Sequence, residues 1–187
     1  MTTLKSRGVA TYADLAAVPD HQVAELILGD LHVSPRPAGA HAVSASALGM
    51  EIGSPFSRGR GGPGGWWIID EPELHLGANV LVPDLAGWRR DRLPHFPKAA
   101  FVEVAPDWVC EVFSPQSHRV DRIRKIPLYA QSNVAFAWLV DPIATTLEVY
   151  RLEHGRWTLL SAHEGAQEIH AEPFEAVLFA LGALWEC

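Results

Sequence analysis

Cysteine is scarce in this sequence: of 187 residues, only Cys110 and Cys187 are cysteines. They form no C-x-x-C pair, so they provide neither a disulfide framework nor a cysteine-rich zinc site. This usage suits a reducing compartment, and we expect a cytoplasmic protein. No basic segment followed by an apolar run opens the chain, so we expect no secretory signal. No apolar run approaches the roughly 20 residues of a membrane-spanning helix, so no membrane association is expected.

Several catalytic signatures are also missing. The glycine-rich stretch RGRGGPGG lacks the G-K-[ST] of a P-loop, and no G-x-S-x-G marks a serine hydrolase. The nine histidines form no H-x-H or H-x-x-x-H pair, so no local zinc site is indicated. The net charge of −7 argues against a tight, nonspecific DNA coat. Basic residues gather in the middle of the chain, and either a local basic face or ordinary solvated side chains would account for them.

The hydrophobic content of 48% is enough for a core, and the length predicts a single domain over residues 1–187. Apolar periodicity predicts helices over 11–18, 38–52 and about 120–128. It also predicts a hairpin of 23–28 and 31–33, and strands over 66–70, 80–88, 108–113 and 135–140. A meander of 146–152 and 156–161 follows these strands. Pro83 favours an edge or a break in its strand. We interpret 54–65 as a mobile loop and a candidate substrate loop, 91–106 as a connection, and 173–185 as an apolar helix or irregular packing segment. The predicted class is α/β (α+β), a mixed sheet with a helix on at least one face and a C-terminal β-meander.

Three carboxylates stand in apolar strand contexts: Glu25 in AELIL, Asp84 in LVPDLAG and Glu111 in WVCEVF. A buried carboxylate costs several kcal/mol unless it is paired or binds a cation. Acids from separate strands provide the oxygen ligands that Mg²⁺ takes in proteins. Lys125, about two turns into the next helix, could position or deprotonate a water molecule. Asp107 lies about 13 Å from Glu111 at the rise of a strand, so these two cannot share one cation.

Each of these residues also has an ordinary structural interpretation. The alternatives are Asp84 as a turn cap, Glu111 paired with Arg122 or Arg124, Glu25 facing solvent, and Lys125 in water. His41 heads the second predicted helix. It either reaches the site or a phosphate, or lies on the helix surface, which is the interpretation we prefer.

The motifs TYADLAAVP, AELILGDLHVSPRP, LVPDLAGW, DWVCEVFSPQSHRVDRIRKIPLYAQ, FAWLVDP and LEVYRL occur in this order. In that order the chain resembles the Uma-type restriction endonuclease family, a branch of the PD-(D/E)XK nuclease superfamily. The resemblance covers nearly the whole chain. It implies a restriction-endonuclease-like mixed β-sheet flanked by helices, a divalent metal ion, and hydrolysis of phosphodiester bonds in nucleic acid, with DNA as the expected substrate. Family analogy and the apolar meander strands lead us to expect a homodimer.

By motif position, the resemblance assigns the PD element to Asp84, the second acid to Glu111 and the early acid to Glu25. The lysine of E-x-K would fall at Phe113, and the resemblance suggests that Lys125 replaces it. Asp121 and Tyr129 also match family-like positions.

The expected site therefore has Asp84, Glu111 and the Val112 backbone carbonyl holding Mg²⁺ or Mn²⁺. Glu25 binds a second ion or a metal-bound water, and Lys125 orients the attacking water. One alternative is a catalytically inactive nuclease fold that binds nucleic acid or serves as an interaction module. Another is an unrelated β-rich structural protein, in which Asp84 and Glu111 would lie apart.

Overall fold

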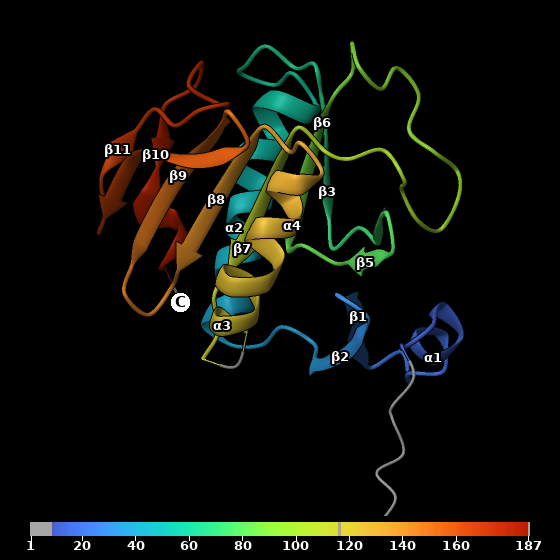
Figure 1. The fold of residues 1–187 in the computed structure, drawn as a ribbon. Helices are drawn as coiled ribbons and strands as arrows, with labels where there is room; N and C mark the ends of the chain where they lie inside the picture. Colours follow the sequence, from blue (N-terminus) through green and yellow to red (C-terminus); the bar gives the residue numbers. More distant parts are fainter. Residues whose placement is uncertain (1–8, 116, 187) are drawn as a thin grey trace, which may run out of the picture.

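A mixed six-stranded sheet forms the centre of the computed structural model, which describes residues 9–115 and 117–186 (Figure 1). The strand order is β10-β9-β8-β7-β6-β3. The strands are β3 (Trp66–Asp70), β6 (Leu85–Arg89), β7 (Trp108–Val112), β8 (Phe136–Asp141), β9 (Thr146–Glu153) and β10 (Arg156–Glu164). Only β7 and β8 are parallel to each other among these neighbours, and the other pairs are antiparallel. The predicted mixed sheet and its C-terminal meander are confirmed.

Two smaller sheets accompany the central one. The first has the order β2-β1-β5-β4, and the second pairs β11 with β12. Their strands are β1 (Gln22–Ile27), β2 (Asp30–Pro35), β4 (Leu74–Leu76), β5 (Asn79–Leu81), β11 (Glu168–Ile169) and β12 (Phe179–Ala180). The predicted strand over 80–88 is therefore wrong as a single element, because Pro83 separates β5 in the small sheet from β6 in the central sheet.

Helices cover both faces of the central sheet, with α2 on one side and α3 to α4 on the other (Figure 1). The helical elements are α1 (Tyr12–Ala16), α2 (Ala40–Ile52), the π-helix η1 (Gly53–Ser57), α3 (His118–Val120), the π-helix η2 (Asp121–Lys125), α4 (Ile126–Gln131) and the 3₁₀ helix η3 (Leu181–Leu184). The segment from α3 to α4 links the parallel strands β7 and β8, which makes a βαβ unit.

Strand β7 is buried on both faces, which explains its nearly unbroken apolar sequence. Cys110 packs in the core beside Leu48 of α2, whereas Val109 packs in the core beside Leu128 of α4. Because side chains alternate along a strand, Glu111 shares the face of Val109 and points toward the segment that contains η2. The sequence thus puts one carboxyl group inside a layer that is otherwise apolar.

Local sequence signals at the N-terminal end are confirmed. Thr11 and Asp14 form the capping box that begins α1. The turn between β1 and β2 has positive φ angles at Leu28 and Gly29, +55° and +84°, and the hairpin follows the predicted segments closely.

The helix after β7 differs from the regular α-helix that the sequence predicted. A wide turn closes where the backbone N–H of Ile126 donates to the carbonyl of Asp121. Ile123, expected on the apolar face, is 66% exposed, because the face that packs on the sheet carries Leu128 and Tyr129. Asp121 and Lys125 are buried instead.

The segment 54–65, predicted as a mobile substrate loop, begins as the wide turn η1, with Pro55 and Phe56 buried. Gly62 packs against Pro55, and its position leaves no room for a Cβ atom. None of this segment lines the large cavity described below, and its role as a substrate loop stays a prediction.

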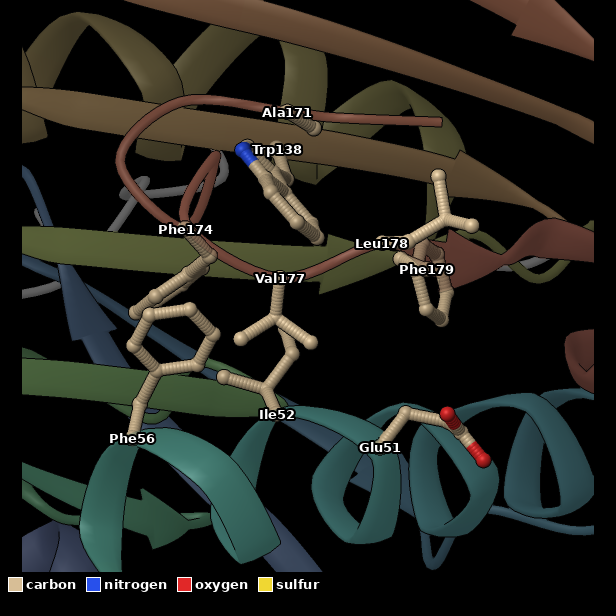
Figure 2. A pocket seen from close by; sticks show the side chains of 9 residues that line it. All are labelled: Glu51, Ile52, Phe56, Trp138, Ala171, Phe174, Val177, Leu178 and Phe179. Atoms are coloured by element: carbon tan, nitrogen blue, oxygen red, sulfur yellow. The ribbon is translucent and has the colours of Figure 1, made fainter. Parts of the chain in front are cut away.

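The C-terminal segment is irregular and packs on the α2 face, as the second of the two predicted forms requires. Figure 2 shows Phe174 and Val177 of this segment facing Ile52, at the end of α2, and Phe56 of η1. The gap between them measures only about 10 Å³, which is no larger than the space of one water molecule. Across residues 9–115 and 117–186, no helix is both long and apolar enough to span a membrane.

Candidate active site

The chain brings Asp84 and Glu111 to the same end of the central sheet. Strand β6 runs antiparallel to β7, so the residue before β6 lies beside the end of β7. Asp84 accepts a hydrogen bond at Oδ2 from the backbone N–H of Val112, with an N···O distance of 2.7 Å. The alternative of an unrelated β-rich structural protein, in which Asp84 and Glu111 would lie apart, is therefore wrong.

The Lys125 ammonium group lies among three carboxyl groups. Its Nζ is 3.0 Å from Glu25 Oε1, 3.0 Å from Glu111 Oε1 and 3.7 Å from Asp121 Oδ1. Nζ also donates to the Val82 carbonyl at 3.0 Å. Asp121 and Lys125 lie four residues apart, so both extend from one face of the segment η2 into the cluster.

Backbone and hydroxyl groups fix the two glutamates. Tyr129 donates to Glu111 Oε1 at 2.6 Å, and the Val82 N–H donates to Glu25 Oε1 at 2.8 Å. Glu25 comes from β1 of the small sheet, and Glu111 and Tyr129 belong to the βαβ unit. The cluster therefore joins two parts of the fold, and the positions suggested for Asp121 and Tyr129 are inside it.

His41, in the first turn of α2, contacts the remaining acid. Its Nε2 lies 3.2 Å from Asp84 Oδ1, and its side chain is 10% exposed. Its Nδ1 is buried and has no hydrogen-bond partner in the structure. The preferred interpretation of His41 as a surface residue is wrong. The other interpretation is confirmed, because the imidazole lies next to Asp84.

One cavity of about 640 Å³ is lined by His41, Lys125 and the four acids Glu25, Asp84, Glu111 and Asp121. The β1–β2 hairpin, the beginning of α2, the end of β7 and the segment of α3 and η2 line it. Glu111 and Lys125 are 1% and 2% exposed, so they form the most enclosed part of the lining.

Burial and crowding change the protonation of the cluster. Burial, followed by repulsion from Asp121, Asp84 and Glu25, raises the pKa of Glu111 well above its ordinary value, although Lys125 opposes this shift. Burial likewise raises the pKa of Asp121. Burial alone would lower the pKa of Lys125, but Glu111 and Glu25 more than reverse this and raise it, so the ammonium stays charged at neutral pH.

The pKa of His41 is also raised. Burial opposes protonation, but the hydrogen bond to Asp84 and the charges of Asp84 and Asp121 outweigh it, and the Val112 backbone carbonyl adds to them. The imidazole therefore lies against Asp84, one of the groups that were expected to hold a metal ion.

The ordinary alternatives for the other residues are wrong. Arg122 pairs with Glu148 and Arg124 with Asp30, so neither is the partner of Glu111. The buried positions of Glu25 and Lys125 exclude a solvated role for either. Phe113, in the position of the E-x-K lysine, is buried beside His118 with a ring separation of 4.4 Å. The role of the Val82 backbone, which donates to Glu25 and accepts from Lys125, was not predicted from the sequence.

The donor chemistry of the cavity fits a hard divalent cation, since carboxylates and a backbone carbonyl are the ligands such ions prefer. Four carboxyl groups, those of Glu25, Asp84, Glu111 and Asp121, face one ammonium group. Burial, together with this surplus of acid, raises the pKa of Glu111 and Asp121, and either a proton or a cation would relieve the repulsion. The ligands are not preassembled: in the part of the chain that the structure describes, no three His, Cys, Asp or Glu side chains form a metal-binding group.

The mixed α/β fold occurs in a solved structure. A structure described as "a putative nuclease belonging to DUF820" from Anabaena variabilis superimposes with a TM-score of 0.74, covering 94% of this chain and 97% of that one at 22% identity. The sequence profile described as "Uma2: Putative restriction endonuclease" matches residues 9–182. The chain therefore belongs to the Uma2 family, as its motifs indicated. No curated protein gives a significant match.

Proposed function

We propose that this protein is a divalent-metal-dependent nuclease that hydrolyses phosphodiester bonds of nucleic acid, with DNA as the first candidate. The observation that carries the proposal is the cluster itself. Buried acids from separate elements surround one ammonium group beside a cavity, where structural ion pairs of this kind are costly to maintain. Membership of the Uma2 family supports the reaction class.

Asp84, Glu111 and the Val112 carbonyl would hold Mg²⁺ or Mn²⁺, and Glu25 would hold a second ion or a water on the first. Bound there, the ion would supply a Lewis acid for the phosphate and lower the pKa of its water. Tyr129 and the Val112 N–H hold the two principal acids in place through the bonds at 2.6 and 2.7 Å. Lys125 would orient the attacking water and donate to an oxygen of the scissile phosphate.

Two isosteric substitutions test the proposal. Asp84→Asn and Glu111→Gln remove one charge each, and both should abolish Mn²⁺-dependent release of fragments from labelled nucleic acid. Glu164→Gln is the matched control, because Glu164 is an exposed carboxylate at the end of β10, away from the cavity. Cleavage that persists in both site variants would refute the assignment.

The second candidate is a catalytically inactive nuclease fold that binds nucleic acid or another partner. It is favoured by Phe113 in the usual lysine position and by the Lys125 ammonium group between Glu25 and Glu111. Thermal unfolding separates the two functions. A rise in Tm with Mn²⁺ that Glu111→Gln removes supports the enzyme, and no rise in the wild-type protein supports the inactive fold.

We further propose that the protein is a cytoplasmic homodimer. Apolar strands of the meander support dimerisation, since Leu159 on the outer strand β10 is 52% exposed. Light scattering in solution tests the oligomeric state, and fractionation of cells tests the compartment.

A further inference from the structure

The groups proposed to act on the phosphate are enclosed. Glu111 and Lys125 are almost fully buried, and the side chain of Asp84 is 13% exposed. The β1–β2 hairpin forms one wall above them, and the beginning of α2 forms another. A phosphodiester group must therefore enter the cavity to meet these side chains.

The cavity is partly open to solvent, and its volume describes the space next to the buried groups. About 640 Å³ lies within the range of roughly 300–1,000 Å³ that is typical of pockets for small ligands. This space takes a nucleotide-sized group. An internal phosphodiester of a duplex is fixed to a paired, stacked scaffold much larger than the cavity, so reaching Glu111 would require the strand to unpair first.

The charge of the lining points the same way. Its carboxyl groups are those of Glu25, Glu71, Asp84, Glu111 and Asp121, and the lysine and arginine side chains within the described lining are Lys125 and Arg36. A surface that follows a duplex needs rows of basic residues against successive phosphates. This lining suits a single phosphodiester, accompanied by the proposed metal ion.

Arg36 is placed to contact a neighbouring phosphate at the rim. Its guanidinium group is half exposed and donates to Glu71 at 2.7 Å and to the Asp20 carbonyl at 3.1 Å. An exposed ion pair of this kind contributes little energy, so a phosphate can take the place of Glu71 at small cost.

We propose that the substrate is an unpaired strand, either a strand end or a flexible single strand, rather than the interior of a duplex. This inference rests on the hydrolytic function proposed above and narrows its substrate. No Phe, Tyr or Trp lines the described part of the cavity, so bases have no stacking platform. Binding would then rest on the phosphodiester group, which every nucleotide carries, so the protein should show little preference for base sequence.

Cleavage assays compare four substrates in Mn²⁺: a single-stranded DNA oligonucleotide, the RNA of the same sequence, the blunt duplex of the DNA, and a relaxed closed circular duplex. The single strands should be cut at least about tenfold faster than the blunt duplex, because unpairing slows the latter. The closed circle should stay intact. The DNA and RNA arms establish which sugar the cavity accepts.

A wall substitution tests whether the cavity is the route. Ser34 of β2 pairs with Val23, on the same face of the hairpin as Glu25, and it lies in the lining. Ser34→Trp should fill the cavity and weaken binding of the labelled single strand, measured by anisotropy in Ca²⁺. Met50→Trp is the control, because Met50 is a 69% exposed residue of α2 outside the lining, and it should bind as the wild type does.

The outcomes separate the two proposals. If the closed circle is cut as fast as the single strand, or if Ser34→Trp binds single strands normally while folded, the substrate inference is overturned and the nuclease proposal stands. If no nucleic acid is cut, the nuclease proposal fails. Anisotropy then decides the inference alone: preference for single strand over duplex, lost in Ser34→Trp, supports it, and equal binding overturns it.

Discussion

Replacing Lys125 with methionine removes an ammonium group and keeps a side chain of similar shape. Glu25, Glu111 and Asp121 then lose their shared counter-charge in a site where Glu111 is 1% exposed. Breaking a buried ion pair by removing one partner typically lowers the free energy of unfolding by about 3–5 kcal/mol. We expect a loss of this size at pH 8.

The loss should shrink as the pH falls. The folded-state pKa of Glu111 is already raised above its ordinary value, and removing Lys125 raises it further. A carboxyl group with a raised folded pKa contributes stability that is fully present below its unfolded pKa and is lost as the pH rises through its folded pKa. The deficit of Lys125→Met should therefore be small near pH 4.5 and grow toward pH 8.

Urea unfolding at both pH values measures this difference, with Arg122→Met as the control. Arg122 pairs with Glu148 near the surface at 3.0 Å, so its loss should cost less than about 1 kcal/mol at either pH. A deficit for Lys125→Met that is equally small, or that does not change with pH, would refute the electrostatic account of the cluster.

Two further predictions concern the groups that hold the acids. His41→Ala should weaken Mn²⁺ binding by about tenfold or more in calorimetric titration, because Asp84 loses its imidazole partner. His41→Gln should restore part of the affinity through its amide nitrogen, and equal affinity in all three proteins would contradict this role. Tyr129→Phe leaves a buried carboxyl oxygen of Glu111 without its 2.6 Å donor, so urea unfolding should show a loss of about 1–3 kcal/mol. An unchanged midpoint would show that Glu111 does not depend on that hydroxyl.

The sequence predicted the elements whose signals are local. Thr11 and Asp14 define the start of α1 within one turn, and Gly29 marks the hairpin by its conformation. The buried acids Glu25 and Glu111 were visible because a charge inside an apolar run is conspicuous.

What the sequence could not supply depends on register and distance. Hydrophobic periodicity assumes a regular helix, so the wide turn at Asp121 to Lys125 was not predicted, and Ile123 was assigned to the wrong face. Arg119, Arg122, Arg124 and Lys125 all follow Glu111 in the helical segment, and only the three-dimensional register selects Lys125 as its partner. The contact between His41 and Asp84 spans 43 positions, and no local pattern records it.

The cluster is divided between two sheets, and this determines when its acids come together during folding. Glu25 reaches Lys125 only when the β1–β2 hairpin docks against the βαβ unit, and Arg124 with Asp30 adds a second tie between them. Local opening of that hairpin would separate the acids without unfolding the central sheet. The complete acid cluster would then form last during folding and be lost first under mild stress. A partly folded chain would keep its main core and lack the proposed nuclease activity.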